Sequence, residues 1–189
     1  VGQRLVEAKK ATLRAQNLTQ QLLTFSKGGE PVKEVMKLGN VIRDSASFAL
    51  SGSKADCALE LDSDLTPVNA DDGQIGQVIQ NLVRNADQAM PEGGTITIKA
   101  ENSTIEPNST VPLAPGDYVK IRVSDSGVGI LEEHLPKVFD PYFSTKQEGS
   151  GLGLASSFSI IKNHGGTIVA SSKPGEGTTF TTYQIGRAS

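Results

Sequence analysis

The sequence predicts an α/β domain preceded by one long N-terminal helix. Segments with apolar residues at helical spacing are followed along the chain by short segments in which apolar and polar residues alternate. Pairs of glycines or a proline stand between several of these segments. With 37% hydrophobic and 21% charged residues among 189, the chain has the composition and length of a globular domain with a buried core.

The first 27 residues are predicted to form a helix with a single apolar stripe. Gly28 and Gly29 end this helix and Pro31 blocks its return. A long helix with one stripe needs a partner, which is either its own domain or, as we favour, a helix from another chain or from upstream. We therefore divide the chain into residues 1–27 and 28–189. The stripe consists of Val1, Leu5, Ala8, Ala15, Leu18, Leu22 and Phe25.

Residues 28–189 are predicted to fold as one α/β unit. Residues 102–117 are polar, contain three prolines and are predicted to form a surface loop. Helical spacing predicts helices over 38–48, 72–90 and 154–162. Alternating patterns predict strands over 58–61, 95–100, 118–124, 167–171 and 178–185, of which the last two form a closing hairpin.

Charge and cysteine content exclude several classes of function. A net charge of -3 gives no basic surplus for nucleic-acid binding. Cys57 is the single cysteine, which excludes an internal disulfide and a cysteine-based zinc site. No apolar run approaches the ~20 residues of a membrane span. Because the chain starts at Val1 rather than Met, we expect a piece of a longer protein, with room upstream for a membrane anchor or sensor.

Two asparagines on the predicted helix over 72–90 are candidate metal ligands. Asn81 and Asn85 are one turn apart and share a face. Amide carbonyl oxygens suit Mg²⁺, which takes one or two protein ligands and fills its octahedron with water and phosphate. Solvated polar residues are the alternative, and the pair alone leaves both interpretations open.

Asp125 follows a predicted strand and precedes two glycines. A carboxylate there accepts a hydrogen bond from an exocyclic amine, while Gly127 and Gly129 let the backbone approach a flat ring. A plain turn at the end of a strand is the alternative, and Asp-Ser-Gly forms such turns readily.

The segment Gly149-Ser150-Gly151-Leu152-Gly153-Leu154 opens a predicted helix. Backbone amides at a helix N-terminus form a cradle for anions. The Gly-Lys-Ser/Thr of a P-loop is absent, and so is the strand directly before a dinucleotide fingerprint. Lys146 lies close enough in sequence to reach a phosphate, although solvation is the default for a lysine.

Phe139, Tyr142 and Phe143 surround Pro141 and form either a hinged lid or a loop packed on the core. We interpret both histidines as structural. His134 lies in a charged turn, and His164 ends a helix, where a cation suits the helix dipole.

In combination these motifs resemble the catalytic, ATP-binding domain of sensor histidine kinases, within the superfamily shared with gyrase, a heat-shock chaperone and a mismatch-repair ATPase. Residues 81–89 resemble the N box, 125–129 the G1 box, 138–143 the F box and 149–154 the G2 box. Gly175-x-Gly177-Thr178-x-Phe180 resembles the terminal glycine motif, and residues 18–26 resemble the second helix of the dimerisation hairpin.

The resemblance implies an open mixed sheet with about three helices on one face and a mobile lid over residues 130–150. It implies that Asp125 binds the adenine amine, that Asn85 holds Mg²⁺ with the help of Asn81, and that Gly151 and Gly153 cradle the phosphates, with Lys146 assisting. Further implied contacts of ATP are Gly127, Gly129, Ile130, Phe143, Gly149, Ser150, Leu152, Leu154 and Thr178.

The implied partners are ATP, the receiver domain of a response regulator and a second copy of the chain, joined through the helical hairpin. A cytoplasmic location is implied, including the cytoplasmic part of a membrane-anchored protein, with no membrane contact by this piece. The chain departs from the family in two respects. The phosphate-accepting histidine of the first hairpin helix is missing, so this piece should not phosphorylate itself, and Gln88 stands where some members carry a cation.

Alternative functions are a serine kinase of the same fold and a nucleotide-sensing module that transfers no phosphate. Hydrolysing relatives carry a glutamate at the position of Asn81, and an amide cannot take a proton from water. A hydrolysing ATPase is therefore disfavoured.

Overall fold

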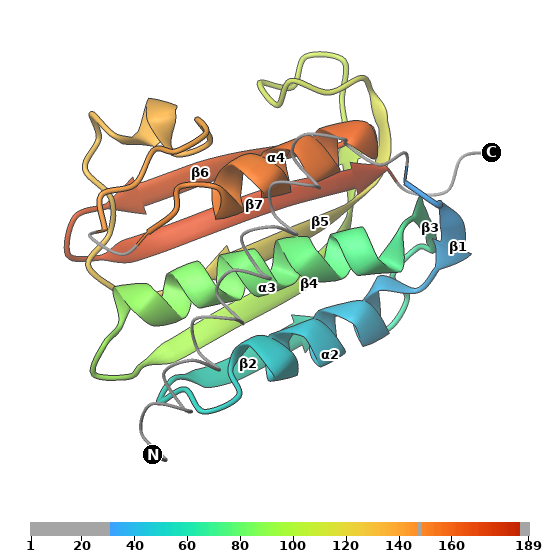
Figure 1. The fold of residues 1–189 in the computed structure, drawn as a ribbon. Coiled ribbons are helices and arrows are strands. Elements are labelled where there is room, and N and C mark those ends of the chain that lie inside the picture. The colour runs from blue at the N-terminus through green and yellow to red at the C-terminus, as the bar shows by residue number, and fades with distance from the viewer. Residues whose placement is uncertain (1–30, 147–148, 186–189) are drawn as a thin grey trace.

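A five-stranded mixed sheet carries three helices on one of its faces (Figure 1). The computed structural model describes residues 31–146 and 149–185. β2 runs parallel to β4, and the other neighbouring strands are antiparallel, which confirms the predicted open mixed sheet. In spatial order the strands are β2 (Asp56–Leu61), β4 (Thr95–Ile105), β5 (Gly116–Ser124), β7 (Gly177–Ile185) and β6 (Thr167–Lys173).

The three helices are α2 (Leu38–Ala49), α3 (Asp72–Ala89) and α4 (Gly153–Asn163). α3 lies between the other two and contacts both of them (Figure 1). Its apolar side chains are buried at helical spacing, and the inward residues of β4 and β5 are buried as well. The helical periodicity of the sequence therefore predicted all three helices to within one residue at each end.

The start of α3 is fixed by its N-cap residue, Asp71. The backbone N–H of Gln74 donates to the Asp71 carboxylate (3.0 Å), as at a typical helix N-cap. The other carboxylate oxygen accepts from the backbone N–H of Val32 (3.1 Å). Asp71 thus joins the chain before β1 to the helix that carries the two asparagines.

Two short strands and one loop differ from the prediction. β1 (Glu34–Met36) and β3 (Val68–Ala70) pair antiparallel in a small second sheet, and neither was predicted. The prediction of a loop over 102–117 is wrong at both ends, since β4 runs on to Ile105 and β5 begins at Gly116. Polar residues of β4 face solvent on one side of the sheet, so their pattern resembles that of a loop.

The sheet face opposite the helices is polar. There the Glu101 carboxylate contacts Lys99 (3.0 Å), Arg122 (3.3 Å) and Lys120 (3.4 Å). The hydrogen bond from Lys99 and the nearby cations lower the pKa of Glu101. One solvated face explains why the strands alternate between apolar and polar residues.

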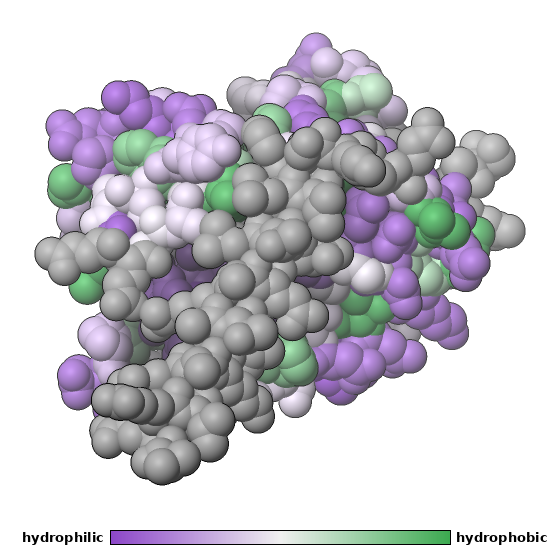
Figure 2. Space-filling model, in the orientation of Figure 1, coloured by the Kyte–Doolittle hydropathy of each residue, from purple (hydrophilic) through white to green (hydrophobic). Residues whose placement is uncertain are grey.

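On the helical side, hydrophobic residues occur among hydrophilic ones on the surface (Figure 2). Among the described residues, the most exposed large hydrophobic ones are Val32, just before β1, and Val35, within β1. Within the described ranges, no helix is long and apolar enough to cross a membrane. The predicted helix over residues 1–27 lies outside the described residues.

His164 ends α4 as a neutral, buried residue, so its interpretation as a cation at the helix end is wrong. Its Nε2 accepts from the backbone N–H of Asp71 (3.1 Å), and its Nδ1 lies 2.8 Å from the carbonyl oxygen of Ile160. Because a carbonyl oxygen only accepts, Nδ1 carries the proton. Burial is the largest cause of the lowered pKa of His164, and Lys33 lowers it further.

We expect the protein to lose stability as the pH falls below the ordinary histidine pKa of about 6.5. Below pH 6.5 the unfolded chain binds a proton at residue 164, whereas the native state, with its lowered pKa, does not. This contribution to the free energy of unfolding is therefore fully present above pH 6.5 and decreases as the pH falls toward the lowered native pKa. The loss is at most about 1.4 kcal/mol per pH unit. Urea unfolding between pH 5.5 and 7.5 measures it.

His164→Gln should flatten this dependence, whereas the matched variant His134→Gln should keep it. Parallel curves of stability against pH for the wild type and His164→Gln would contradict the assignment.

Candidate functional site

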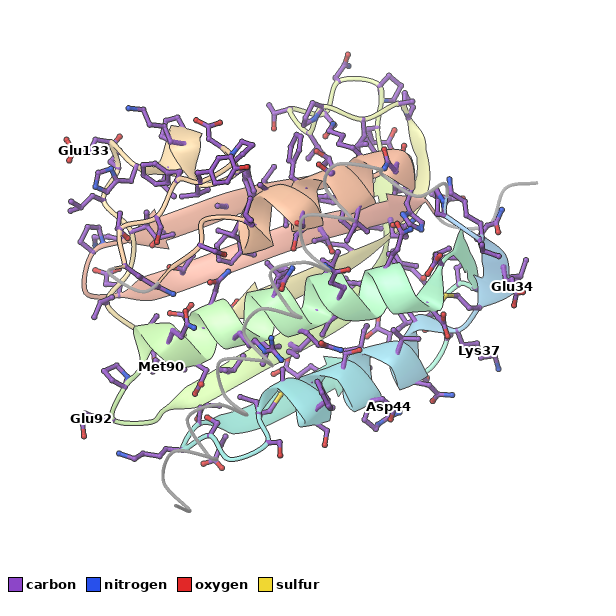
Figure 3. The ribbon with its side chains drawn as sticks, in the orientation of Figure 1. Glu34, Lys37, Asp44, Met90, Glu92 and Glu133 are labelled. Atoms are coloured by element: carbon purple, nitrogen blue, oxygen red, sulfur yellow. The ribbon has the colours of Figure 1, made fainter. Side chains whose placement is uncertain are left out.

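A cavity of about 500 Å³ lies beside the C-terminal half of α3. Its other walls are the turn after β5, parts of the segment 138–151, the start of α4 and the beginning of β7. Met90, which follows α3, and Glu133, which precedes the 3-10 turn η1 (Leu135–Lys137), mark this end of the molecule (Figure 3). Segments from separate parts of the sequence therefore meet at one cavity.

The amide of Asn81 has a fixed orientation in the wall formed by α3. Its Nδ2 donates to the carbonyl oxygen of Gly153 (3.0 Å) and to Ser157 Oγ (3.3 Å). The Gly153 carbonyl oxygen only accepts, so the nitrogen and not the oxygen must face it. Oδ1 of Asn81 therefore remains available to the cavity as a neutral hydrogen-bond acceptor. Asn85 lines the same wall.

Asp125 leaves the end of β5 with one carboxylate oxygen held by the backbone. Its Oδ1 accepts from the N–H groups of Gly127 (2.8 Å) and Thr178 (3.3 Å). No described residue hydrogen-bonds to Oδ2, and Asp125 lines the cavity. Burial is the largest cause of the raised pKa of Asp125, and the two N–H groups and the Lys146 ammonium oppose this rise. The arrangement presents one carboxylate oxygen as an acceptor.

The aromatic residues around Pro141 have separate positions. Phe139 packs on the core, with its ring centroid 5.6 Å from that of Phe158 and 6.3 Å from that of Phe180. Phe143 lines the cavity and packs against His134 (5.5 Å between ring centroids). Packing on the core thus holds for Phe139, and the hinged-lid interpretation stays a prediction.

The aromatic segment and the glycine-rich segment touch through their backbones. Tyr142, which is 67% exposed, has a φ of 66°, and its N–H donates to the carbonyl oxygen of Gly151 (3.1 Å). A Cβ on Gly151 would lie 2.4 Å from the carbonyl carbon of Tyr142. Only glycine therefore lets these two cavity walls approach so closely.

Lys146 reaches across the cavity to α3. Its Nζ donates to Gln88 Oε1 at 2.8 Å. The residue is exposed as a whole, yet its ammonium loses enough hydration at the cavity mouth to lower its pKa. The negative charge of Asp125 acts against this shift.

All but two of the predicted site residues line the cavity. Gly127 does not, because it packs on the end of α3, where a Cβ would lie 2.5 Å from the Ala89 carbonyl oxygen. Leu152 does not either, because it is buried at the N-cap position of α4. Those that do are Asn81, Asn85, Asp125, Gly129, Ile130, Phe143, Lys146, Gly149, Ser150, Gly151, Gly153, Leu154 and Thr178.

The prediction did not include several lining residues. Gln88 and Arg84 share the helical face of the two asparagines, so helical spacing was a usable signal for both. Val138 and Phe180 lie within the recognised motifs. Ala89 and Val128 also lie within those motifs, whereas Ser144 and Thr145 carried no signal in the sequence.

The oxygen donors of the cavity suit a hard cation. Among the described residues, no three or more His, Cys, Asp or Glu side chains are grouped so that they could hold a metal ion. A Mg²⁺ ion here would rely on the amide oxygens of Asn81 and Asn85, on water and on phosphate. One or two protein ligands with such a remainder are typical of Mg²⁺, so the residues present fit this ion.

The sequence matches one family model over residues 70–185, described as "Histidine kinase-, DNA gyrase B-, and HSP90-like ATPase". Sensor kinase CckA of Brucella abortus (strain 2308) is 40% identical over 183 residues, which are 93% of this chain and 19% of that protein. Sensor histidine kinase ZraS of Escherichia coli (strain K12) is 34% identical over 181 residues, 94% of this chain and 36% of that protein. The chain thus spans well under half the length of these curated relatives.

Two solved structures share the fold. The nucleotide-free catalytic domain of histidine kinase ThkA superposes with a TM-score of 0.66 at 31% identity, over 82% of this chain and 95% of that one. Full-length ShkA in complex with AMPPNP gives a TM-score of 0.78 at 21% identity, over 99% of this chain and 39% of that one. The ShkA likeness shows the fold alone.

Proposed function

We propose a phosphoryl-transfer function from the premise that this chain belongs to the family of histidine kinase-, DNA gyrase B- and HSP90-like ATPases. In this proposal the cavity binds ATP with Mg²⁺ and presents the γ-phosphoryl to a histidine outside this chain, as the catalytic region of a two-component sensor histidine kinase. One observation carries the proposal: the asparagine pair, Asp125 and the glycine-rich segment line one cavity together.

The adenine end lies at Asp125. The free carboxylate oxygen accepts from the exocyclic amine of adenine, and the backbone-held oxygen keeps the carboxylate in place. Ile130, Leu154 and Phe180 supply apolar wall for the flat ring. Both features favour adenine over a base with a carbonyl oxygen at that position.

The phosphate end lies between α3 and the start of α4. The backbone amides of Gly151 and Gly153, with the N-terminal end of α4, form a cradle for anionic phosphates. Asn85 and Asn81 would hold Mg²⁺, which would supply positive charge against the developing phosphate charge. Because the Asn81 amide cannot accept a proton, it does not activate water for attack on the γ-phosphoryl group. The phosphoryl group is therefore transferred only when a histidine imidazole attacks it.

The acceptor histidine is proposed to come from the first hairpin helix of a longer protein. His134 and His164 are the two histidines of this chain, and neither lines the cavity. The longer protein is proposed to dimerise through the hairpin, to act in the cytoplasm and to pass its phosphoryl group to the receiver domain of a response regulator. Magnesium and these partners belong to the proposal.

Phosphoryl transfer from γ-labelled Mg-ATP tests the function. We expect acid-labile, base-stable label on a natural chain that includes the upstream helix, and no label on residues 1–189 alone. Acid-stable label would point instead to a hydroxyl acceptor, as in a serine kinase. Nucleotide binding without label would favour a nucleotide-sensing module and contradict the kinase.

A further inference from the structure

We propose that Gln88 is a positioning residue that holds the Lys146 ammonium over the phosphate end of the cavity, where Lys146 supplies the cation that is missing at position 88 of α3. In this role Lys146 makes the cavity prefer a nucleoside triphosphate to a diphosphate. The inference rests on the proposed function, because it takes the cavity to bind adenine nucleotides.

The contact between the two residues spans the cavity. Gln88 lies one turn before the end of α3, and Lys146 lies 58 residues later, in the wall opposite. Both side chains line the cavity, and the Nζ–Oε1 distance of 2.8 Å is that of a good hydrogen bond. A lysine at position 88 would therefore bring its ammonium to the region that the Lys146 ammonium now occupies.

A neutral partner suits this role better than an acidic one. The amide oxygen of Gln88 takes one of the three ammonium N–H donors of Lys146 and leaves the positive charge uncompensated. The two remaining donors are available to phosphate oxygens. A carboxylate at position 88 would neutralise the ammonium and repel the phosphates.

Among the described residues, one other cation, Arg84, could take the proposed role of Lys146. Among residues 31–146 and 149–185, the charged ones that line the cavity are Asp125, Arg84 and Lys146. Asp125 lies at the proposed adenine end, and its charge raises the pKa of Lys146 against the larger effect of burial. Arg84 lies one turn before Gln88 on α3, but no hydrogen bond or ion pair to another described residue holds its guanidinium. Lys146 is thus the positioned cation, and Arg84 provides the matched control.

Calorimetric titration with Mg-ATP and Mg-ADP tests the proposal through the ratio of the two affinities. We expect Lys146→Gln to weaken ATP binding by roughly tenfold or more and to affect ADP by much less, because a charged hydrogen bond to the terminal phosphate is lost. Gln88→Glu should lower the ratio in the same direction. Arg84→Gln should leave the ratio unchanged.

Relocating the cation is the decisive step. The double variant Lys146→Gln, Gln88→Lys should recover the preference for ATP over ADP. In this variant the lysine at position 88 of α3 places an ammonium in the region from which that of Lys146 was removed. The three positions that are changed, 84, 88 and 146, carry exposed or half-exposed side chains, so the variants should fold, which circular dichroism checks.

Three results would overturn the proposal. The first is an unchanged ratio in Lys146→Gln, and the second is loss of the preference in Arg84→Gln instead. The third is a well-folded double variant without recovery, which would remove the positioning role of Gln88. Failure of the wild-type chain to bind either nucleotide is a different result, since it would overturn the proposed function itself.

Discussion

Asp125→Asn should lower the affinity for ATP by about tenfold to about a hundredfold, as expected for loss of a hydrogen bond to a charged group. The Gly127 and Thr178 N–H groups still require an acceptor, so the asparagine oxygen should stay on them. The new NH₂ group then faces the adenine amine, and two donors meet. Guanine presents a carbonyl oxygen at that place, so the same change should raise the affinity for GTP relative to ATP.

Titration calorimetry with ATP and GTP measures both effects. Asp117→Asn is a matched control on the same strand, because Asp117 binds Thr104 on the solvent side and does not line the cavity. A well-folded Asp125→Asn variant with unchanged affinity for ATP would contradict the adenine role of this carboxylate.

Of these substitutions, Gly177→Ala should cause the largest loss of folding stability. A Cβ at this position would lie 2.0 Å from the Asp125 carbonyl oxygen, and the φ of 104° is unfavourable for alanine. We expect a loss of about 3 kcal/mol or more, which combines about 1–2 kcal/mol for the backbone conformation with about 1–3 kcal/mol for overpacking. Because Asp125 must move, nucleotide affinity should fall too.

Gly175→Ala is the matched control for this prediction. Gly175 lies in the same turn with a φ of 79°, and a Cβ there would meet no atom within 4 Å. It should cost only the backbone part, about 1–2 kcal/mol. Urea unfolding of the two variants gives the difference, and equal losses would show that the approach of Gly177 to Asp125 does not matter.

Local patterns predicted most of the fold because burial on one face of a helix or strand leaves a period in the sequence. α3 is an example, since Ile75, Ile79 and Leu82 recur at helical spacing and are buried. The same reasoning failed at β1 and β3, because three residues are too few to show a period. It failed at Ser103 of β4, because a solvent-facing strand residue is as polar as one in a loop.

The sequence by itself determined which chemical groups the site contains. The asparagine pair, Asp125 and the glycine-rich segment were identifiable because each is a short run of residues with its own spacing. Family membership, which those runs predicted, is confirmed by the match over residues 70–185. The helix over residues 1–27 and the hairpin dimer stay predictions.

Only the tertiary structure decided how those groups are used. It set the orientation of the Asn81 amide through Gly153, the neutral state of His164 through Asp71, and the contact of Lys146 with Gln88. It also placed Gly127 and Leu152 outside the lining. Each of these depends on atoms that are remote in the chain and meet only after the helices pack on the sheet. Spacing along the sequence records which side of an element is buried, whereas hydrogen-bond partners and protonation depend on what lies opposite.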